Sequence, residues 1–184
     1  MFHLIIVDDK KSIRKGLMEF IDWNELGFSV IGDFSSAAEA IRFVESECVD
    51  VMMTDIVMPD VNGLELIREV KLINPEIKVI ILSAYEKFEY AQEAVRLGAV
   101  HYLTKPVNLD KLKEEFLRLR QVLSEEEILR CQKKEYGLFT AERFFNNLVS
   151  NMYPDTTTIW EKANELNIPL WKGPFCVLRI IPGQ

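Results

Sequence analysis

The stretch DVMMTDIVMPDVNG, residues 50–63, carries the strongest indication of the fold. Its first part, Asp50–Thr54, has an uninterrupted apolar centre, as expected for a strand covered on both faces of a parallel sheet. Asp55 follows this strand directly, and Pro59 and Gly63 mark the turn toward the next segment. We therefore predict a buried parallel strand with an aspartate at its carboxyl end.

The same alternation of strand and helix extends on both sides of this stretch. Four further short apolar runs predict the other strands: His3–Val7, Ser29–Asp33, Lys78–Leu82 and His101–Leu103. Helical spacing follows in five segments: Ser12–Phe20, Ala37–Ser46, Gly63–Leu72, Lys87–Leu97 and Leu109–Leu123. Strands that alternate with helices favour right-handed crossovers. The fold class is therefore α/β, a flavodoxin-like, doubly wound, five-stranded parallel sheet.

Composition excludes several classes of protein. Of the 184 residues, 48% are hydrophobic, which is enough for a buried core, and no apolar run approaches the roughly 20 residues that span a bilayer. We therefore expect no membrane partner. The three cysteines are widely spaced and odd in number, so we expect reduced thiols in a cytoplasmic protein. With a net charge of −7 and no basic cluster longer than Lys10–Lys11 or Lys133–Lys134, this stretch is expected to bind DNA poorly.

The pattern changes after Leu123. A charged, helix-favouring segment is followed by the bulkier Phe139–Val149, a break near Pro154, a short helix at Ile159–Leu166 and an apolar strand at Phe175–Ile181. An isolated strand cannot bury itself, so the chain is expected to stop just inside a second domain. Three parts are predicted: a first domain at 1–123, a helical linker at 124–153 and the beginning of a truncated α+β domain at 154–184.

Polar residues follow the predicted strands where each one ends. Asp8 and Asp9 follow the first strand, Asp55 the third, Ser83 the fourth and Lys105 the fifth. Crowded carboxylates repel one another unless a cation lies among them, and Mg²⁺ prefers such oxygen ligands. Phosphoryl transfer needs mainly positioning and charge compensation, which a metal, an ammonium and a hydroxyl supply around a carboxylate nucleophile. The pattern predicts phosphoryl transfer to an aspartate.

Four motifs make a family resemblance specific. They are VDD at 7–9, TDIVMPDVNG at 54–63, LSAYEKFEYA at 82–91 and YLTKPV at 102–107. Together they resemble the receiver domain of two-component response regulators, over residues 3 to about 121. Lys10 departs from the family, which often has an acidic residue beside the metal pair.

The resemblance implies a metal-assisted phosphoacceptor. Asp55 is the expected acceptor of the phosphoryl group. Asp8, Asp9, Asp55 and the backbone carbonyl of Val57 are the expected ligands of Mg²⁺ or another divalent cation. No organic cofactor is expected, and the protein is expected to be a switch that assists its own phosphorylation rather than a conventional enzyme.

The resemblance also implies a switch. Ser83 and Lys105 are expected to bind the phosphoryl oxygens, and a cis bond between Lys105 and Pro106 directs the lysine inward. Tyr102 is the aromatic residue expected to change rotamer on activation, although a strand tyrosine is also commonly a half-buried core residue. Val57 and Tyr85 flank the expected phosphate without an amide or a carboxylate, so self-dephosphorylation is expected to be slow.

The partners follow from the same resemblance. A sensor histidine kinase is the expected phosphoryl donor, because His3 and His101 offer no convincing phosphohistidine. The segments IDWNELGF at 21–28 and SAYEKFEYA at 83–91 resemble the YesN-like regulators, whose full-length members carry an AraC-type DNA-binding module. No such module lies in these 184 residues, so transcriptional output through DNA is expected only from domains absent here.

Alternatives remain open from the residues alone. Asp8 and Asp9 also suit a helix N-terminus. Leu109–Leu123 has 3,4 spacing that fits either a dimeric coiled coil or a last helix packed on the sheet. A homodimer on phosphorylation is a separate expectation, which follows from the switch. A metal-dependent phosphohydrolase would need an acid where Val57 stands. A receiver-like module that acts only in dimerisation or docking, without phosphorylation, is the remaining alternative.

Overall fold

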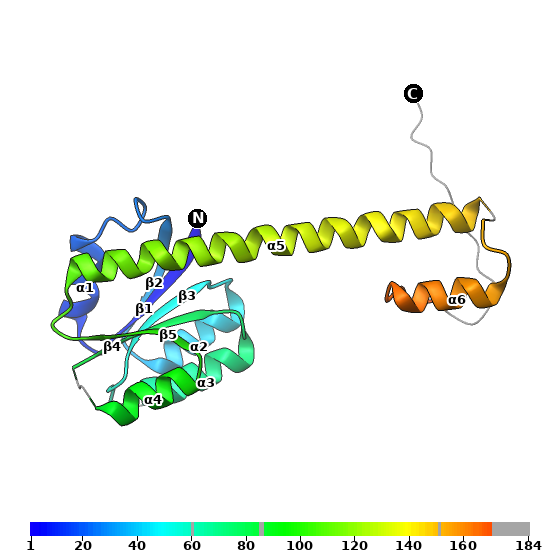
Figure 1. The fold of residues 1–184 in the computed structure, drawn as a ribbon. Helices are drawn as coiled ribbons and strands as arrows, with labels where there is room; N and C mark the ends of the chain where they lie inside the picture. Colours follow the sequence, from blue (N-terminus) through cyan, green and yellow to red (C-terminus); the bar gives the residue numbers. More distant parts are fainter. Residues whose placement is uncertain (60, 85–86, 151, 171–184) are drawn as a thin grey trace. The chain divides into compact units, whose positions relative to one another are not determined.

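The computed structural model describes residues 1–59, 61–84, 87–150 and 152–170 (Figure 1). Five strands lie in this part of the chain: β1 (Phe2–Val7), β2 (Phe28–Phe34), β3 (Val51–Asp55), β4 (Lys78–Ser83) and β5 (Ala99–Thr104). The helices there are α1 (Lys11–Phe20), α2 (Ala37–Ser46), α3 (Gly63–Ile73), α4 (Phe88–Arg96), α5 (Leu109–Val149) and α6 (Thr156–Glu165). The predicted strand at Phe175–Ile181 lies outside the described residues.

The sheet has the strand order β2-β1-β3-β4-β5, and every neighbouring pair is parallel. This confirms the predicted flavodoxin-like fold. Figure 1 shows α1 and α5 on one face of the sheet and α2, α3 and α4 on the other. Because the order reverses direction at β1, the carboxyl ends of β1 and β3 border the crevice in which such folds bind ligands.

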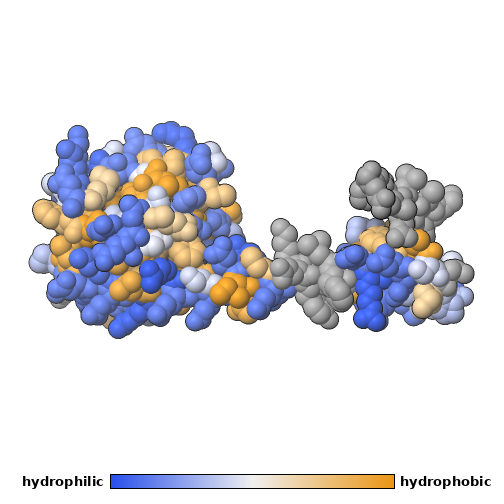
Figure 2. Space-filling view, turned by 90° about the horizontal axis from the view of Figure 1, so that it is seen from above, coloured by the Kyte–Doolittle hydropathy of each residue, from blue (hydrophilic) through white to orange (hydrophobic). Residues whose placement is uncertain are grey.

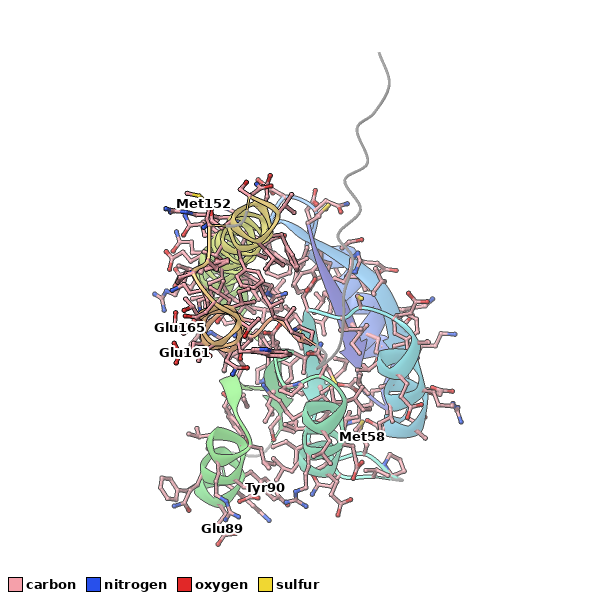
Figure 3. All side chains as sticks on the ribbon, turned by 90° about the vertical axis from the view of Figure 1, so that its right-hand side faces the viewer. Met58, Glu89, Tyr90, Met152, Glu161 and Glu165 are labelled. Carbon is pink, nitrogen blue, oxygen red and sulfur yellow. The ribbon has the colours of Figure 1, made fainter. Side chains whose placement is uncertain are left out.

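Alternate residues of each strand supply the two halves of the core. One half lies under α2, α3 and α4 and includes Ile5 and Met52 of the strands, Leu66 of α3 and Ala94 of α4. Met58, in the loop after β3, is buried in the same cluster, and Tyr90 of α4 packs against it, whereas its neighbour Glu89 is exposed (Figure 3). The loop that follows Asp55 is thereby anchored in the core.

The other half of the core is aromatic and fixes the first part of α5. The Phe116 ring is fully buried and meets Trp23 edge-on at 4.7 Å and Phe28 at 5.0 Å, measured between ring centroids. Leu112 and Leu119 are buried on the same stripe of the helix. The 3,4-spaced stripe therefore packs on the sheet, and the alternative in which this stripe forms a dimeric coiled coil is wrong.

The structure divides the chain into two compact units, Met1–Val122 and Leu123–Gln184. The division into three parts stays a prediction. Helix α5 continues without a break for 41 residues, from Leu109 through Leu123 to Val149. Past Leu123 the helix exposes Ile128 and Leu129. Figure 2 shows apolar and hydrophilic side chains side by side on the face it presents.

Within the second unit, a small aromatic group joins the end of α5 to the segment before α6. Phe144 is buried, and the centroid of its ring lies 5.6 Å from the centroid of the Tyr153 ring. Helix α6 begins at Thr156, three residues before the predicted start, because Asp155 caps it by accepting a hydrogen bond from the Thr158 N–H (2.8 Å). Glu161 and Glu165, one turn apart, lie on its exposed surface (Figure 3).

Candidate phosphoryl-acceptor site

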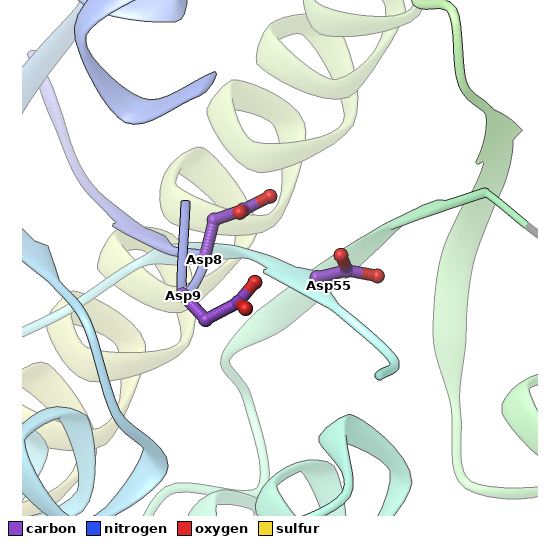
Figure 4. A group of neighbouring side chains, drawn as sticks. All are labelled: Asp8, Asp9 and Asp55. Carbon is purple, nitrogen blue, oxygen red and sulfur yellow. The ribbon is translucent and has the colours of Figure 1, made fainter. Parts of the chain in front are cut away.

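Three carboxylates meet at the carboxyl edge of the sheet. Asp55 is the last residue of β3, and Asp8 and Asp9 follow β1, whose Val7 pairs with Thr54 in the neighbouring strand. Each aspartate offers one oxygen atom, and these three atoms all lie within 4.8 Å of one another (Figure 4). Asp8 and Asp55 are buried and Asp9 is half-buried. The structure therefore brings together the three acids that the sequence placed at strand ends.

Lys105 brings a positive charge to the three acids. Its ammonium donates hydrogen bonds to Asp8 Oδ2 (2.6 Å) and Asp55 Oδ2 (2.7 Å). The Lys105–Pro106 peptide bond is cis, as predicted. Burial alone would lower the pKa of Lys105, but the hydrogen bonds and negative charges of Asp55 and Asp8 outweigh it and raise this pKa above its usual value. Lys105 is therefore a fixed positive charge in the cluster.

Ser83 and Lys105 are held together through the backbone. Ser83 ends β4, is fully buried and pairs with Thr104 in β5. Its carbonyl accepts a hydrogen bond from the Lys105 N–H (2.7 Å). Because Asp55 pairs with Leu82, the residue before Ser83, the ends of β3, β4 and β5 share one edge. The predicted hydroxyl and ammonium groups thus lie on adjacent strand ends.

The charges of the cluster suit a divalent cation. Three carboxylates share one ammonium, which leaves negative charge uncompensated within the group. Asp55 Oδ1 accepts hydrogen bonds from the N–H groups of Ile56 (2.6 Å) and Val57 (3.3 Å). Among the residues the structure describes, Asp9 Oδ1 is the one buried side-chain polar atom without a hydrogen-bond partner. A hard cation with oxygen ligands would satisfy that atom, so the residues present fit such an ion.

Val57 and Tyr102 are the remaining predicted site residues that the structure describes. Val57 follows Asp55 by two residues, and its side chain is 45% exposed, beside the acceptor rather than in the core. Tyr102 of β5 is partly buried and packs against the core half under α2, α3 and α4. Its role as a switch and the role of the Val57 carbonyl as a ligand remain predictions. Tyr85, the other predicted neighbour of the phosphate, lies outside the described residues.

The sequence did not indicate a role at the site for two residues, one of which, Gly63, was predicted only as a turn residue. Arg14 of α1 is buried and contacts both Asp8 and Asp33. A charged residue three positions before the buried Leu17, on the core-facing side of a helix, was the available signal. Gly63 is the other: a Cβ built there would lie 2.0 Å from the Asp55 carbonyl oxygen. Its need for glycine arises from this approach, which only the fold reveals.

Comparison with known proteins defines the class. The model of the response regulator receiver domain family matches residues 4–117, so the chain belongs to this family, whose members are phosphoacceptor switches rather than conventional enzymes. The structure resembles the REC domain of AraT, a response regulator from Geobacillus stearothermophilus, with a TM-score of 0.65 and 34% identity. That match covers 68% of this chain and 98% of the other.

Curated relatives are named as transcriptional regulators. The chain is 29% identical over 159 residues to the transcriptional regulatory protein YesN of Bacillus subtilis, which covers 83% of this chain and 43% of YesN. It is 34% identical over 127 residues to HptR of Staphylococcus aureus, which covers 69% of this chain and 50% of HptR. The chain thus spans about half the length of the curated relatives it matches. Within its described residues, no helix is both long and apolar enough to cross a bilayer.

Proposed function

We propose that Asp55 accepts a phosphoryl group from the phosphohistidine of a sensor kinase. A carboxylate oxygen of Asp55 attacks the phosphorus in line, the phosphorus–nitrogen bond breaks, and its electron pair leaves with the imidazole. The observation that carries the proposal is the meeting of Asp8, Asp9 and Lys105 around Asp55. These groups supply the charge compensation and positioning that phosphoryl transfer needs.

The proposed metal is Mg²⁺, held by Asp8, Asp9, Asp55 and the backbone carbonyl of Val57. When bound, it neutralises charge that develops on the transferring phosphoryl group. The unpartnered Asp9 Oδ1 and the close approach of the three acids support this assignment. The Lys105 ammonium bridges an Asp8 oxygen and an Asp55 oxygen, and its positive charge offsets their mutual repulsion before any phosphate arrives.

Phosphorylation replaces the single negative charge of the Asp55 carboxylate with a phosphoryl group that carries about −1.5 to −2 charges, and the groups around it respond. Ser83 and Lys105 move onto the new oxygens, which biases Tyr102 and α4 toward a second arrangement. The proposed consequence is a homodimer or a changed direction of α5. This switch predicts different self-association and different amide exchange over residues 83–105 in the phosphorylated protein; identical behaviour in both measurements would contradict it.

The contacts of the two histidines and the names of the relatives support the proposed partner and output. Both histidines make structural contacts: His3 Nδ1 donates to the Cys48 carbonyl (2.9 Å), and His101 lies 3.4 Å from Glu115. This supports a phosphoryl donor outside the chain. The proposed output is transcription, through an AraC-type DNA-binding domain outside these residues, in the cytoplasm. The names of YesN and HptR support the transcriptional output.

Incubation of the purified protein with acetyl phosphate and Mg²⁺, followed by intact mass measurement, tests the proposal. We expect a gain of one phosphoryl group that disappears when a chelator removes the metal. The same chain without phosphate donor is the control. If no gain occurs under any metal condition, the protein is instead a dimerisation or docking module that keeps the acidic cluster without using it.

Val57→Asn is expected to shorten the lifetime of the phosphorylated protein. The exposed Val57 side chain cannot orient water beside the phosphate, whereas a carboxamide can. We expect self-dephosphorylation to accelerate about tenfold, below the 10²–10⁴ typical of a true general base. The decay of the phosphorylated mass after removal of donor measures this rate. Val57→Leu, which stays apolar, is the matched control, and an equal rate in both variants would refute the argument.

A further inference from the structure

We propose that Arg14 is a positioning residue for the metal site. Its guanidinium holds the peptide between Asp8 and Asp9 in the one orientation that directs both carboxylates at the same cation. This inference rests on the proposed function, because it concerns the same site. It adds a residue of α1 that does not belong to the acidic cluster itself.

Arg14 joins three elements through two hydrogen bonds. Its Nη1 donates to the Asp8 carbonyl (2.6 Å), and its Nε donates to Asp33 Oδ2 (2.8 Å). The side chain is only 10% exposed, whereas that of Asp33 is 38% exposed. A guanidinium presents its donors in a rigid planar fork, so two acceptors fixed in space determine its orientation. Arg14 thereby connects α1, the end of β1 and β2.

The carbonyl that Arg14 binds belongs to the peptide bond between Asp8 and Asp9. Because a peptide unit is planar, holding its oxygen fixes the backbone from which both side chains leave. The flanking groups are held as well: the Asp8 N–H donates to the Phe34 carbonyl (3.1 Å), and the Lys10 N–H donates to Asp8 Oδ1 (2.9 Å). Without Arg14, the Asp8 carbonyl would lose its buried donor and this peptide would be free to rotate.

Positioning and simple electrostatics predict opposite effects at this residue. The guanidinium is a positive charge bonded to the backbone of a predicted metal ligand, so it repels a divalent cation. If charge were its only influence, removing it would tighten Mg²⁺ binding. If it orients Asp8 and Asp9, removing it weakens Mg²⁺ binding, because outer groups that hold metal ligands commonly contribute 10–100-fold to affinity.

The test is the dissociation constant of Mg²⁺, measured by titration calorimetry on the full chain at a temperature where circular dichroism shows each variant folded. Arg14→Met is expected to bind Mg²⁺ about 10–100-fold more weakly than the wild type. Arg14→Lys keeps the charge but cannot make both bonds, so it is expected to lose about tenfold, at the lower end of that range. Lys15→Met removes the same charge from the exposed next residue and is expected to change affinity by less than about twofold.

Each outcome of the Mg²⁺ titrations either supports or overturns the positioning role of Arg14. Unchanged or tighter Mg²⁺ binding by Arg14→Met overturns the inference, as does wild-type affinity in Arg14→Lys. If Arg14→Met does not fold, Arg14→Lys decides alone. If the wild type binds no Mg²⁺, the proposed function and this inference fail together. If the wild type binds Mg²⁺ and is labelled by acetyl phosphate while Arg14→Met binds Mg²⁺ equally well, only this inference fails.

Discussion

Gly63→Ala is expected to lower the free energy of unfolding by about 3 kcal/mol, a large effect for the addition of one methyl group. A Cβ at position 63 would lie 2.0 Å from the Asp55 carbonyl oxygen and 2.9 Å from both the Asp55 carbonyl carbon and the Ile56 Cα. All three atoms belong to the backbone of a buried segment, so none can move aside cheaply. The same displacement would move the Asp55 carboxylate, so we also expect slower labelling by acetyl phosphate.

Gly16→Ala is the matched control for this variant. Gly16 lies inside α1, and a Cβ there would meet only the Phe20 side chain, at 3.8 Å. Alanine in a helix is favoured over glycine by up to about 1 kcal/mol, so this variant is expected to be as stable as the wild type or more so. Urea unfolding followed by circular dichroism compares the two. Equal stability of both variants would show that the approach of residue 63 to Asp55 does not constrain the fold.

Phe116→Ala is expected to cost about 3–5 kcal/mol of unfolding free energy. The Phe116 ring is fully buried and makes edge-on contacts with Trp23 and Phe28, so its removal leaves a cavity between α5 and the sheet. Because this cluster lies on the face of the sheet that carries α1 and α5, the variant that remains folded at low temperature should still be labelled on Asp55. The urea midpoint, measured by circular dichroism, reports the loss of stability.

Leu117→Ala controls for the loss of a large side chain from the same turn of α5. Leu117 is 40% exposed, so its truncation is expected to cost less than about 1 kcal/mol. A cost for Phe116→Ala no greater than that for Leu117→Ala would mean that α5 is not held to the sheet through this aromatic cluster.

The sequence was sufficient for the fold because its periodicities are strong. Continuous apolar runs such as Val51–Met53 are typical of strands covered on both faces, and Asp55 directly after such a run falls at a sheet edge. The rule that parallel strands end on the same side then places Asp8, Asp9 and Lys105 near it. The cis bond before Pro106 came from the family resemblance rather than from any local pattern.

Other features depend on contacts that periodicity does not encode. Nothing in the residues around Arg14 reveals that its partners are the Asp8 carbonyl and Asp33. The second pairing depends on the register of β1 against β2, in which Asp33 lies opposite Ile6. The close approach of Gly63 to Asp55 likewise depends on the path of the intervening loop. The charged residues after Leu123 have good helix propensity and predicted a helical linker. Its unbroken continuation of the preceding helix was not predicted, because the apolar stripe ends at Leu123.

The most direct test of the central claim locates the phosphoryl group. The protein is incubated with acetyl phosphate and Mg²⁺, the acyl phosphate is reduced with borohydride, and the peptides are sequenced by mass spectrometry alongside an Asp55→Ala variant. The account predicts a reduced side chain at position 55 in the wild type and no phosphoryl gain in the variant. A phosphoryl group on another residue, or an equal gain in Asp55→Ala, would contradict it.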